Sequence, residues 1–183
     1  MFLNILFRAF LRIPFVLNSE LTYNLIFHIN LASILIFSVG IMFTPWVALF
    51  ICTLGSVLGE WMYCLIYGCG EETPVFLLFM VLSPGLAGAL ISVLRQKLKP
   101  SLINEIIAMI IGGIWQFVGL MIGAFVWYLG FLSFYLIIVF IVYPLYSTIF
   151  DLFLIPLSLL LNKGLRSAFN LKFFNDLLNE PIK

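Results

Sequence analysis

Three long stretches of the 183-residue chain contain no Asp, Glu, Lys or Arg. They run from Leu21 to Gly59, from Thr73 to Leu94 and from Ile106 to Phe150. A helix that crosses about 30 Å of hydrocarbon needs about 20 apolar residues, because each residue adds about 1.5 Å. The pattern therefore predicts two membrane crossings in the first stretch, one in the second and two in the third.

Helix breaks within the two longer stretches can be located from single residues. Pro45 suits the first position of a new helix. The pair Trp127 and Tyr128, typical of the membrane interface, precedes Gly130, where the third stretch should turn back. The predicted helices are 21–43, 45–68, 74–94, 104–128 and 131–161. The last is too long for one straight span, so we expect its prolines to kink it or its final turns to lie in the interface.

The distribution of Lys and Arg orients these helices. The loop 95–99 and the C-terminal tail are basic, whereas the loop 70–73 carries two glutamates and no basic residue. Basic loops favour the cytoplasmic side of a membrane. We therefore expect a protein of the cell membrane with the loop 95–99 and the C-terminus in the cytoplasm. Residue 20 then lies outside, although Arg8 and Arg12 just upstream favour the inside.

A sixth, short span from Phe2 to Leu17 would satisfy both requirements. It places two arginines in the apolar layer at a cost of about 2.5–3.5 kcal/mol each if central. Because they are four residues apart, they share one helix face and can point into the bundle or snorkel. The rival interpretation is an amphipathic helix on the outer surface, which leaves five spans. We favour six, so the expected fold is a single all-α domain over residues 1–183.

Composition agrees with a membrane protein and excludes several other classes. Hydrophobic residues make up 64% of the chain and charged residues 9%, against about 45–50% and 25% in soluble domains. A net charge of +1 without a dense basic stretch argues against a nucleic acid partner. One histidine and three cysteines without C-x-x-C spacing predict no metal site and no cofactor. We expect the cysteines to pack as small apolar groups, although a Cys64–Cys69 disulfide is geometrically possible.

An acidic residue inside a predicted span is the first candidate for function, because a charge there is costly. Glu60 lies about 12 Å from the outer end of the helix 45–68. It follows Gly55 and Gly59, a G-x-x-x-G pair that lets another helix approach closely, and it precedes Trp61 and Tyr63. Two interpretations remain open. Glu60 is either the polar handle of an aromatic-lined pocket open to the outside or part of an ion pair with one of the N-terminal arginines.

Small residues form packing faces on two further predicted helices. Gln116 lies on such a face at mid-membrane, where it can make an interhelical hydrogen bond or contact a ligand. The sequence Ser83-Pro84-Gly85 should interrupt the helix 74–94 near its middle. The glycines expected to pack against other helices are Gly85 and Gly88 on 74–94 and Gly112, Gly119 and Gly123 on 104–128.

The other acidic residues near predicted spans have ordinary explanations. Asp151 lies about 30 Å along a helix that should begin at the outer face, so we expect a wetted carboxylate at the inner interface. Glu105 stands at the start of its helix, where the helix dipole favours a negative charge. The sequence shows no Ser–His, Cys–His or paired-carboxylate arrangement and no phosphate-binding loop. We therefore expect a protein that is not an enzyme.

The region from Thr44 to Leu98 resembles the substrate-binding membrane subunits (S components) of energy-coupling factor (ECF) transporters. The motifs that carry the resemblance are Pro45-x-x-Ala48, Gly55-x-x-x-Gly59-Glu60 and Pro84-Gly85-x-x-Gly88-Ala89 leading to Arg95. The resemblance implies a six-helix subunit with both ends in the cytoplasm. A coupling transmembrane subunit and ATPase subunits would be its partners, besides membrane lipid.

Two hypotheses for the function follow. The first is an uptake subunit that binds a vitamin-like small molecule from outside. Its pocket would be formed by Glu60, Trp61, Tyr63, Trp115 and Gln116, with Trp127 and Tyr128 near the mouth. The alternative is a non-transporting scaffold similar to the rod-shape-determining membrane subunit, in which the glycine faces dock other proteins and Glu60 is a structural group.

Overall fold

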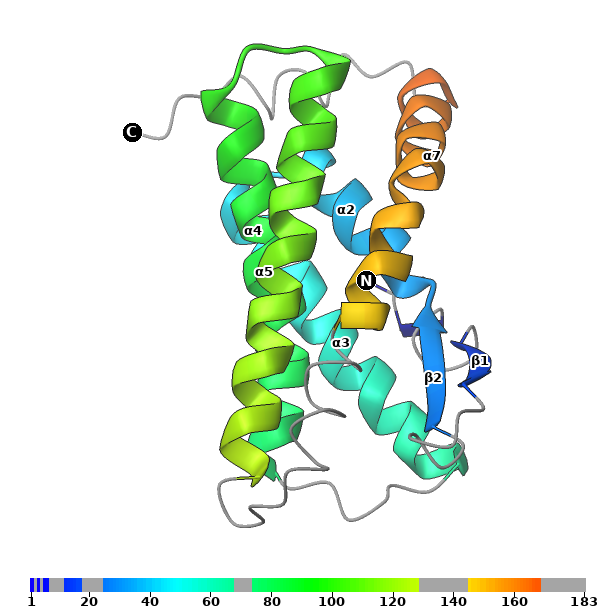
Figure 1. Cartoon of the computed structure of the whole chain (residues 1–183). Helices are drawn as coiled ribbons and strands as arrows, with labels where there is room; N and C mark the ends of the chain where they lie inside the picture. The colour runs from blue at the N-terminus through cyan, green and yellow to red at the C-terminus, as the bar shows by residue number, and fades with distance from the viewer. Residues whose placement is uncertain are drawn as a thin grey trace.

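The computed structural model is a bundle of helices with one β-hairpin (Figure 1). It describes residues 1, 3, 5–6, 12–17, 25–67, 74–128 and 145–168, and the side chains of 1, 3, 5–6, 31–66, 81–123 and 145–167 within them. The helices are α2 (Ala32–Met42), α3 (Pro45–Tyr67), α4 (Pro74–Lys97), α5 (Leu102–Tyr128), a segment over 145–153, and α7 (Ile155–Ala168). The hairpin strands are β1 (Arg12–Leu17) and β2 (Leu25–Asn30).

Three of the described helices are long and apolar enough to cross a membrane. They are Pro45–Ile66 in α3, Leu102–Gly123 in α5 and Leu145–Ser167, which includes α7. The predicted helices 45–68, 74–94 and 104–128 correspond to α3, α4 and α5 with ends that differ by three residues or fewer. The chain is therefore a helical protein of membrane type.

The prediction for the N-terminal region is wrong. β1 pairs antiparallel with β2, with Arg12 opposite Asn30 and Leu17 opposite Leu25. α2 has only 11 residues, or about 16 Å, which is too short to cross a bilayer. Neither the span 2–17 nor the helix 21–43 forms as expected, and the all-α description holds only outside the hairpin.

The hairpin has a physical explanation in the composition of its strands. Arg12–Leu17 reads RIPFVL and Leu25–Asn30 reads LIFHIN, both rich in β-branched and aromatic residues that favour strands. Short apolar runs of this kind fit a strand as well as a helix, so hydrophobicity alone does not distinguish them. Pro14 also disfavours a helix interior, because its ring lacks the N–H that the helix needs.

The last helix is broken where its sequence contains proline. A turn at Leu154 separates the segment 145–153 from α7. The Leu154 N–H donates to the Asp151 carbonyl at 3.0 Å, one residue nearer than in an α-helix. Pro156 follows and has no N–H to continue the helical pattern. The expected kink in this helix therefore lies close to Pro156, while residues 131–144 lie outside the described part.

α4 packs between α3 and α5 and does not break at its proline. The helix runs from Pro74 to Lys97 through Pro84, so the expected interruption is absent. α4 and α5 lie side by side along the molecule and are joined by the short loop 98–101 (Figure 1). Ser101 caps α5, because its Oγ accepts the Asn104 N–H at 3.2 Å.

α2 is short but lies at the centre of the bundle. Phe37 and Ile41 of α2 pack with Ile91 of α4, Met109 of α5 and Ile155 of α7. A second cluster joins α2 to α3 and α4 through Ile36, Cys52 and Ala87. The apolar core therefore gathers around α2, and each longer helix contributes one face to it.

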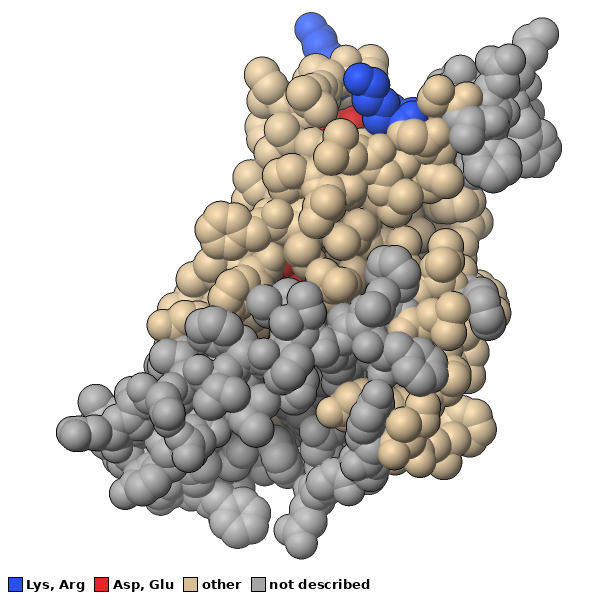
Figure 2. Space-filling view, turned by 90° about the vertical axis from the view of Figure 1, so that its right-hand side faces the viewer, with Lys and Arg blue, Asp and Glu red and all other residues tan. Residues whose placement is uncertain are grey.

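The described basic residues gather at one end of the molecule. The Lys and Arg side chains visible in Figure 2 lie at this end, which we call the basic end. They are Arg95 and Lys97 on α4, Lys99 in the loop, and Lys163 and Arg166 on α7. Cys64, near the other end of α3, is disulfide-bonded, so the expectation that it packs as a simple apolar group is wrong, whereas Cys52 is a buried free thiol.

Candidate functional site

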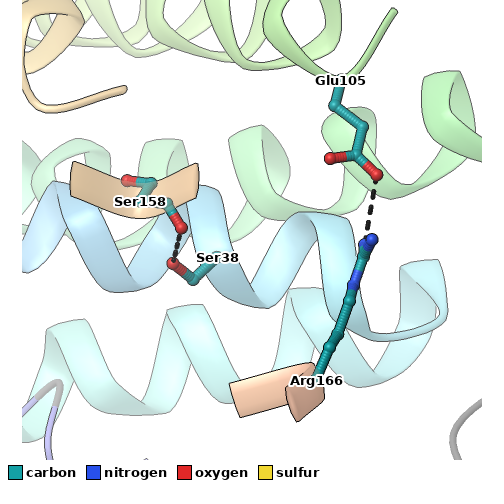
Figure 3. Close-up of polar contacts among 4 residues, drawn as sticks. All are labelled: Ser38, Glu105, Ser158 and Arg166. Carbon is teal, nitrogen blue, oxygen red and sulfur yellow. Dashed lines mark hydrogen bonds and ion pairs between the residues drawn. The ribbon is translucent and has the colours of Figure 1, made fainter. Parts of the chain in front are cut away.

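Most buried serines of the bundle are explained by contacts between helices. Ser38 Oγ donates to the Ser158 carbonyl at 3.4 Å (Figure 3), and Ser158 Oγ donates to the Ile34 carbonyl at 3.1 Å. Ser92 Oγ donates to the Phe43 carbonyl at 2.5 Å. These hydroxyls satisfy backbone oxygens of neighbouring helices, so they need no ligand to account for their burial.

Glu60 is different, because it brings a carboxyl group into the interior of a membrane-spanning helix. Its side chain is 6% exposed and lies 15 residues beyond Pro45, or about 22 Å along α3. Ser56 and Thr53 share its helix face at spacings of four and three residues. Ser56 is fully buried, and the buried Thr53 Oγ1 has no hydrogen-bond partner.

A second carboxyl group, Asp151, lies at comparable depth on another helix. Its side chain is 5% exposed and lies 15 residues before Arg166, or about 22 Å from the basic end. The expectation of a wetted carboxylate at the inner interface is therefore wrong, because its depth follows from the basic end of the helix and not from an assumed outer start. Thr148, one turn away, is also buried, and its Oγ1 has no partner.

These residues form what we call the polar set: Thr53, Ser56 and Glu60 on α3, and Thr148 and Asp151 on the segment 145–153. Figure 2 shows acidic atoms at two levels, beside the basic side chains at the top and halfway down among apolar side chains. Carboxylates accept hydrogen bonds, and hydroxyls both donate and accept. The carboxyl group of Glu60 could therefore accept a hydrogen bond from a ligand with a cationic or amide nitrogen.

Sequence reasoning missed four members of the polar set. Thr53, Ser56 and Glu60 recur at helical spacing within one apolar stretch, and Thr148 precedes Asp151 by three residues. This periodicity of polar residues was the available signal, because it places them on one buried face of each helix. A single serine or threonine in a span carries no such signal, since its hydroxyl can bond the backbone of its own helix.

Gln116 is buried on α5, and its backbone carbonyl accepts a hydrogen bond from Ser83 Oγ of α4 at 3.3 Å. α4 contacts both α5 and α3, and it meets α3 at Thr53 and Cys52, beside Gly85 and Gly88. A pocket shared by Gln116 and Glu60 stays a prediction.

The predicted aromatic lining lies largely away from the bundle interior. Trp61 is 60% exposed and Trp115 is also exposed, so both face outward. Tyr63 is partly buried beside Glu60 in the sequence. Trp127 and Tyr128 belong to α5, but their side chains lie outside the described part.

The predicted packing glycines lie at close helix contacts. A Cβ at Gly85 would overlap Thr53 of α3, and one at Gly88 would lie 2.8 Å from Cys52 Sγ. On α5, a Cβ at Gly112 would overlap Ile91 and one at Gly119 would overlap Ser83, both on α4. The others, Gly55, Gly59 and Gly123, are buried.

Comparison with known protein families, curated proteins and solved structures finds no match to this chain. Among the described residues, no group of three His, Cys, Asp or Glu side chains is placed to hold a metal ion. The function must therefore be inferred from the chemistry of the polar set.

Proposed function

We propose that the chain is the substrate-binding membrane subunit of an ECF-type uptake transporter for a vitamin-like molecule. The observation that carries the proposal is the buried carboxyl group of Glu60 in a membrane-spanning helix. Ionisable groups in such positions mark substrate sites by default, because their cost demands a reason. Ser56, one turn earlier on the same face, is fully buried as well, so the surroundings of Glu60 on α3 are shielded from water.

The proposed ligand carries a cationic or amide nitrogen that donates to Glu60. The described basic side chains lie at the basic end, about 22 Å from Glu60 along α3. A hydrogen bond to a carboxylate contributes about 1.5–3 kcal/mol. Its loss should therefore weaken binding by roughly 10- to 100-fold.

The proposed orientation places the basic end and the C-terminus on the cytoplasmic side of the cell membrane. Lys and Arg favour that side, and the disulfide at Cys64, far from the basic end, suits an oxidising exterior. The sequence contains no phosphate-binding loop, so ATPase subunits and a coupling membrane subunit would supply the energy.

The glycine contacts support the uptake subunit over the scaffold. A scaffold would use its glycine faces to dock other proteins. Gly85, Gly88, Gly112 and Gly119 instead lie against neighbouring helices of the same chain. These four positions are therefore not free to serve as docking surfaces for other proteins.

The decisive experiment is native mass spectrometry of gently purified protein, followed by the Glu60→Gln variant. We expect a retained small molecule in the wild type and at least tenfold lower occupancy in Glu60→Gln, with little change in Tm. Glu105→Gln is the matched control, because Glu105 lies at the basic end, and it should retain the molecule. Unchanged occupancy with a collapsed Tm would identify Glu60 as part of an ion pair with Arg8 or Arg12 and refute the pocket.

Coupling is tested separately by affinity purification from the native host. An uptake subunit should co-purify with an ATPase pair and a shared helical subunit. Recovery of the chain alone, or with proteins of cell-wall synthesis, would favour the scaffold.

A further inference from the structure

An ion pair lies at the basic end, with a second arginine nearby. Arg166 Nη2 of α7 lies 3.1 Å from Glu105 Oε1 of α5 (Figure 3). Arg95, at the end of α4 beyond its apolar stretch, is partly buried close by. Burial and then the like charge of Arg166 lower the pKa of Arg95, while Glu105 opposes them. Glu105 therefore pairs with Arg166, and Arg95 is close enough to both to feel their charges.

The surroundings add positive charge without adding further acids. Lys97, Lys99 and Lys163 belong to the same end, and Glu105 is its one acidic residue in the described part of the chain (Figure 2). This end closes three long helices, so it lies at the level of lipid headgroups. An anion bound there would offset the repulsion between the two guanidinium groups.

Exposed aliphatic side chains lie on the outward faces of the two helices that the ion pair joins. Ile103, Ile107 and Ile110 line one face of α5 at spacings of four and three residues, and all are exposed. Leu157 and Leu160 are exposed on α7. These faces point away from the ion pair, because Ile103 and Ile107 each lie two residues, or about 200° around the helix, from Glu105. Membrane lipid would cover them, and the ion pair lies at the level of its headgroups.

We propose that Arg95 and Arg166 bind the phosphate of an anionic phospholipid headgroup. Guanidinium groups match phosphate geometry and bind it through paired hydrogen bonds. Basic sites between helix ends on the cytoplasmic side bind anionic headgroups in the same way. Glu105 holds Arg166 when the lipid is absent and competes with the phosphate when it is present. The proposal does not depend on the transport function.

The test adds defined lipids to delipidated protein in detergent and measures bound lipid by native mass spectrometry. We expect phosphatidylglycerol to bind in preference to phosphatidylcholine, which carries the same phosphate but no net charge. Arg95→Gln and Arg166→Gln should each lower phosphatidylglycerol occupancy roughly fivefold, as expected for one lost basic contact. Lys97→Gln, with the same charge change at an exposed position of α4, should change it less than twofold.

Glu105→Gln provides a second variant with the opposite expected sign. Removing the competing carboxylate should raise phosphatidylglycerol occupancy, whereas a purely structural ion pair would give no gain. Equal losses in Lys97→Gln and Arg166→Gln would overturn the site in favour of general surface charge. Competition by inorganic phosphate as strong as that by phosphatidylglycerol would show a free-anion site and overturn the lipid assignment.

Discussion

Asn162 carries two polar atoms into the interior without bonding either of them. Its side chain on α7 is 2% exposed, and neither Oδ1 nor Nδ2 has a hydrogen-bond partner. Ser158, one turn earlier, makes use of its hydroxyl by donating to the Ile34 and Leu154 carbonyls, each at 3.1 Å. Burying an unpaired amide costs about 1–3 kcal/mol. Asn162 should therefore be a source of instability in the fold.

We expect Asn162→Leu to raise the free energy of unfolding by about 1–3 kcal/mol, because leucine has a similar volume and no polar atoms. Ser158→Ala, in contrast, should lower it by about 1 kcal/mol through the lost hydrogen bonds. Thermal unfolding in detergent measures both. A lower Tm for Asn162→Leu would mean that an ordered water or a ligand satisfies the amide in solution.

Also at the residue scale, Glu60 and Asp151 show what the type of a residue predicts about its position in the membrane. The cost of a carboxyl group in hydrocarbon singled out Glu60 from sequence, and its burial agrees with that argument. The same cost applied to Asp151, but the sequence argument placed it in water at the inner interface, whereas its side chain is 5% exposed. The depth of a residue in the membrane depends on where its helix begins and ends, and the residue type does not determine that.

At the scale of elements, glycine contacts fix the spacing between α4 and its neighbours. Gly119 of α5 lies so close to Ser83 of α4 that an added Cβ would overlap it. Gly164 of α7 is the opposite case, because nothing lies within 4 Å of the position that its Cβ would take. Substitutions at these two glycines therefore measure the effect of packing and the effect of helix propensity separately.

Gly119→Ala should lower the free energy of unfolding by about 1–3 kcal/mol, because overpacking outweighs the gain in helix propensity. Gly164→Ala should raise it by about 0.5–1 kcal/mol through propensity alone. Chemical or thermal unfolding of both variants in the same detergent checks the pair. Equal effects of the two substitutions would show that α4 and α5 do not pack as closely as described.

At the scale of the whole molecule, the basic end predicts the orientation in the membrane. The cysteine of a Lys97→Cys variant should react with a membrane-impermeant maleimide only after the cells are permeabilised, because Lys and Arg favour the cytoplasmic side. Glu72→Cys, in the acidic loop 70–73, should react in intact cells. The unsubstituted protein supplies the background, with Cys52 buried and Cys64 bonded. Labelling of the Lys97→Cys variant in intact cells would show that the orientation is the reverse of the one predicted.

The hydrophobic pattern of the sequence was sufficient to predict α3, α4 and α5. Runs of about 20 apolar residues leave few alternatives to a membrane-type helix. The pattern failed for residues 12–30, where short apolar runs suit strands equally well and only the pairing of β1 with β2 decides between them. The burial of Asp151 was likewise decided by tertiary structure. Periodicity assigns a residue to a face of its own helix, but which helix covers that face depends on packing between distant segments, here on α4 inserting between α3 and α5.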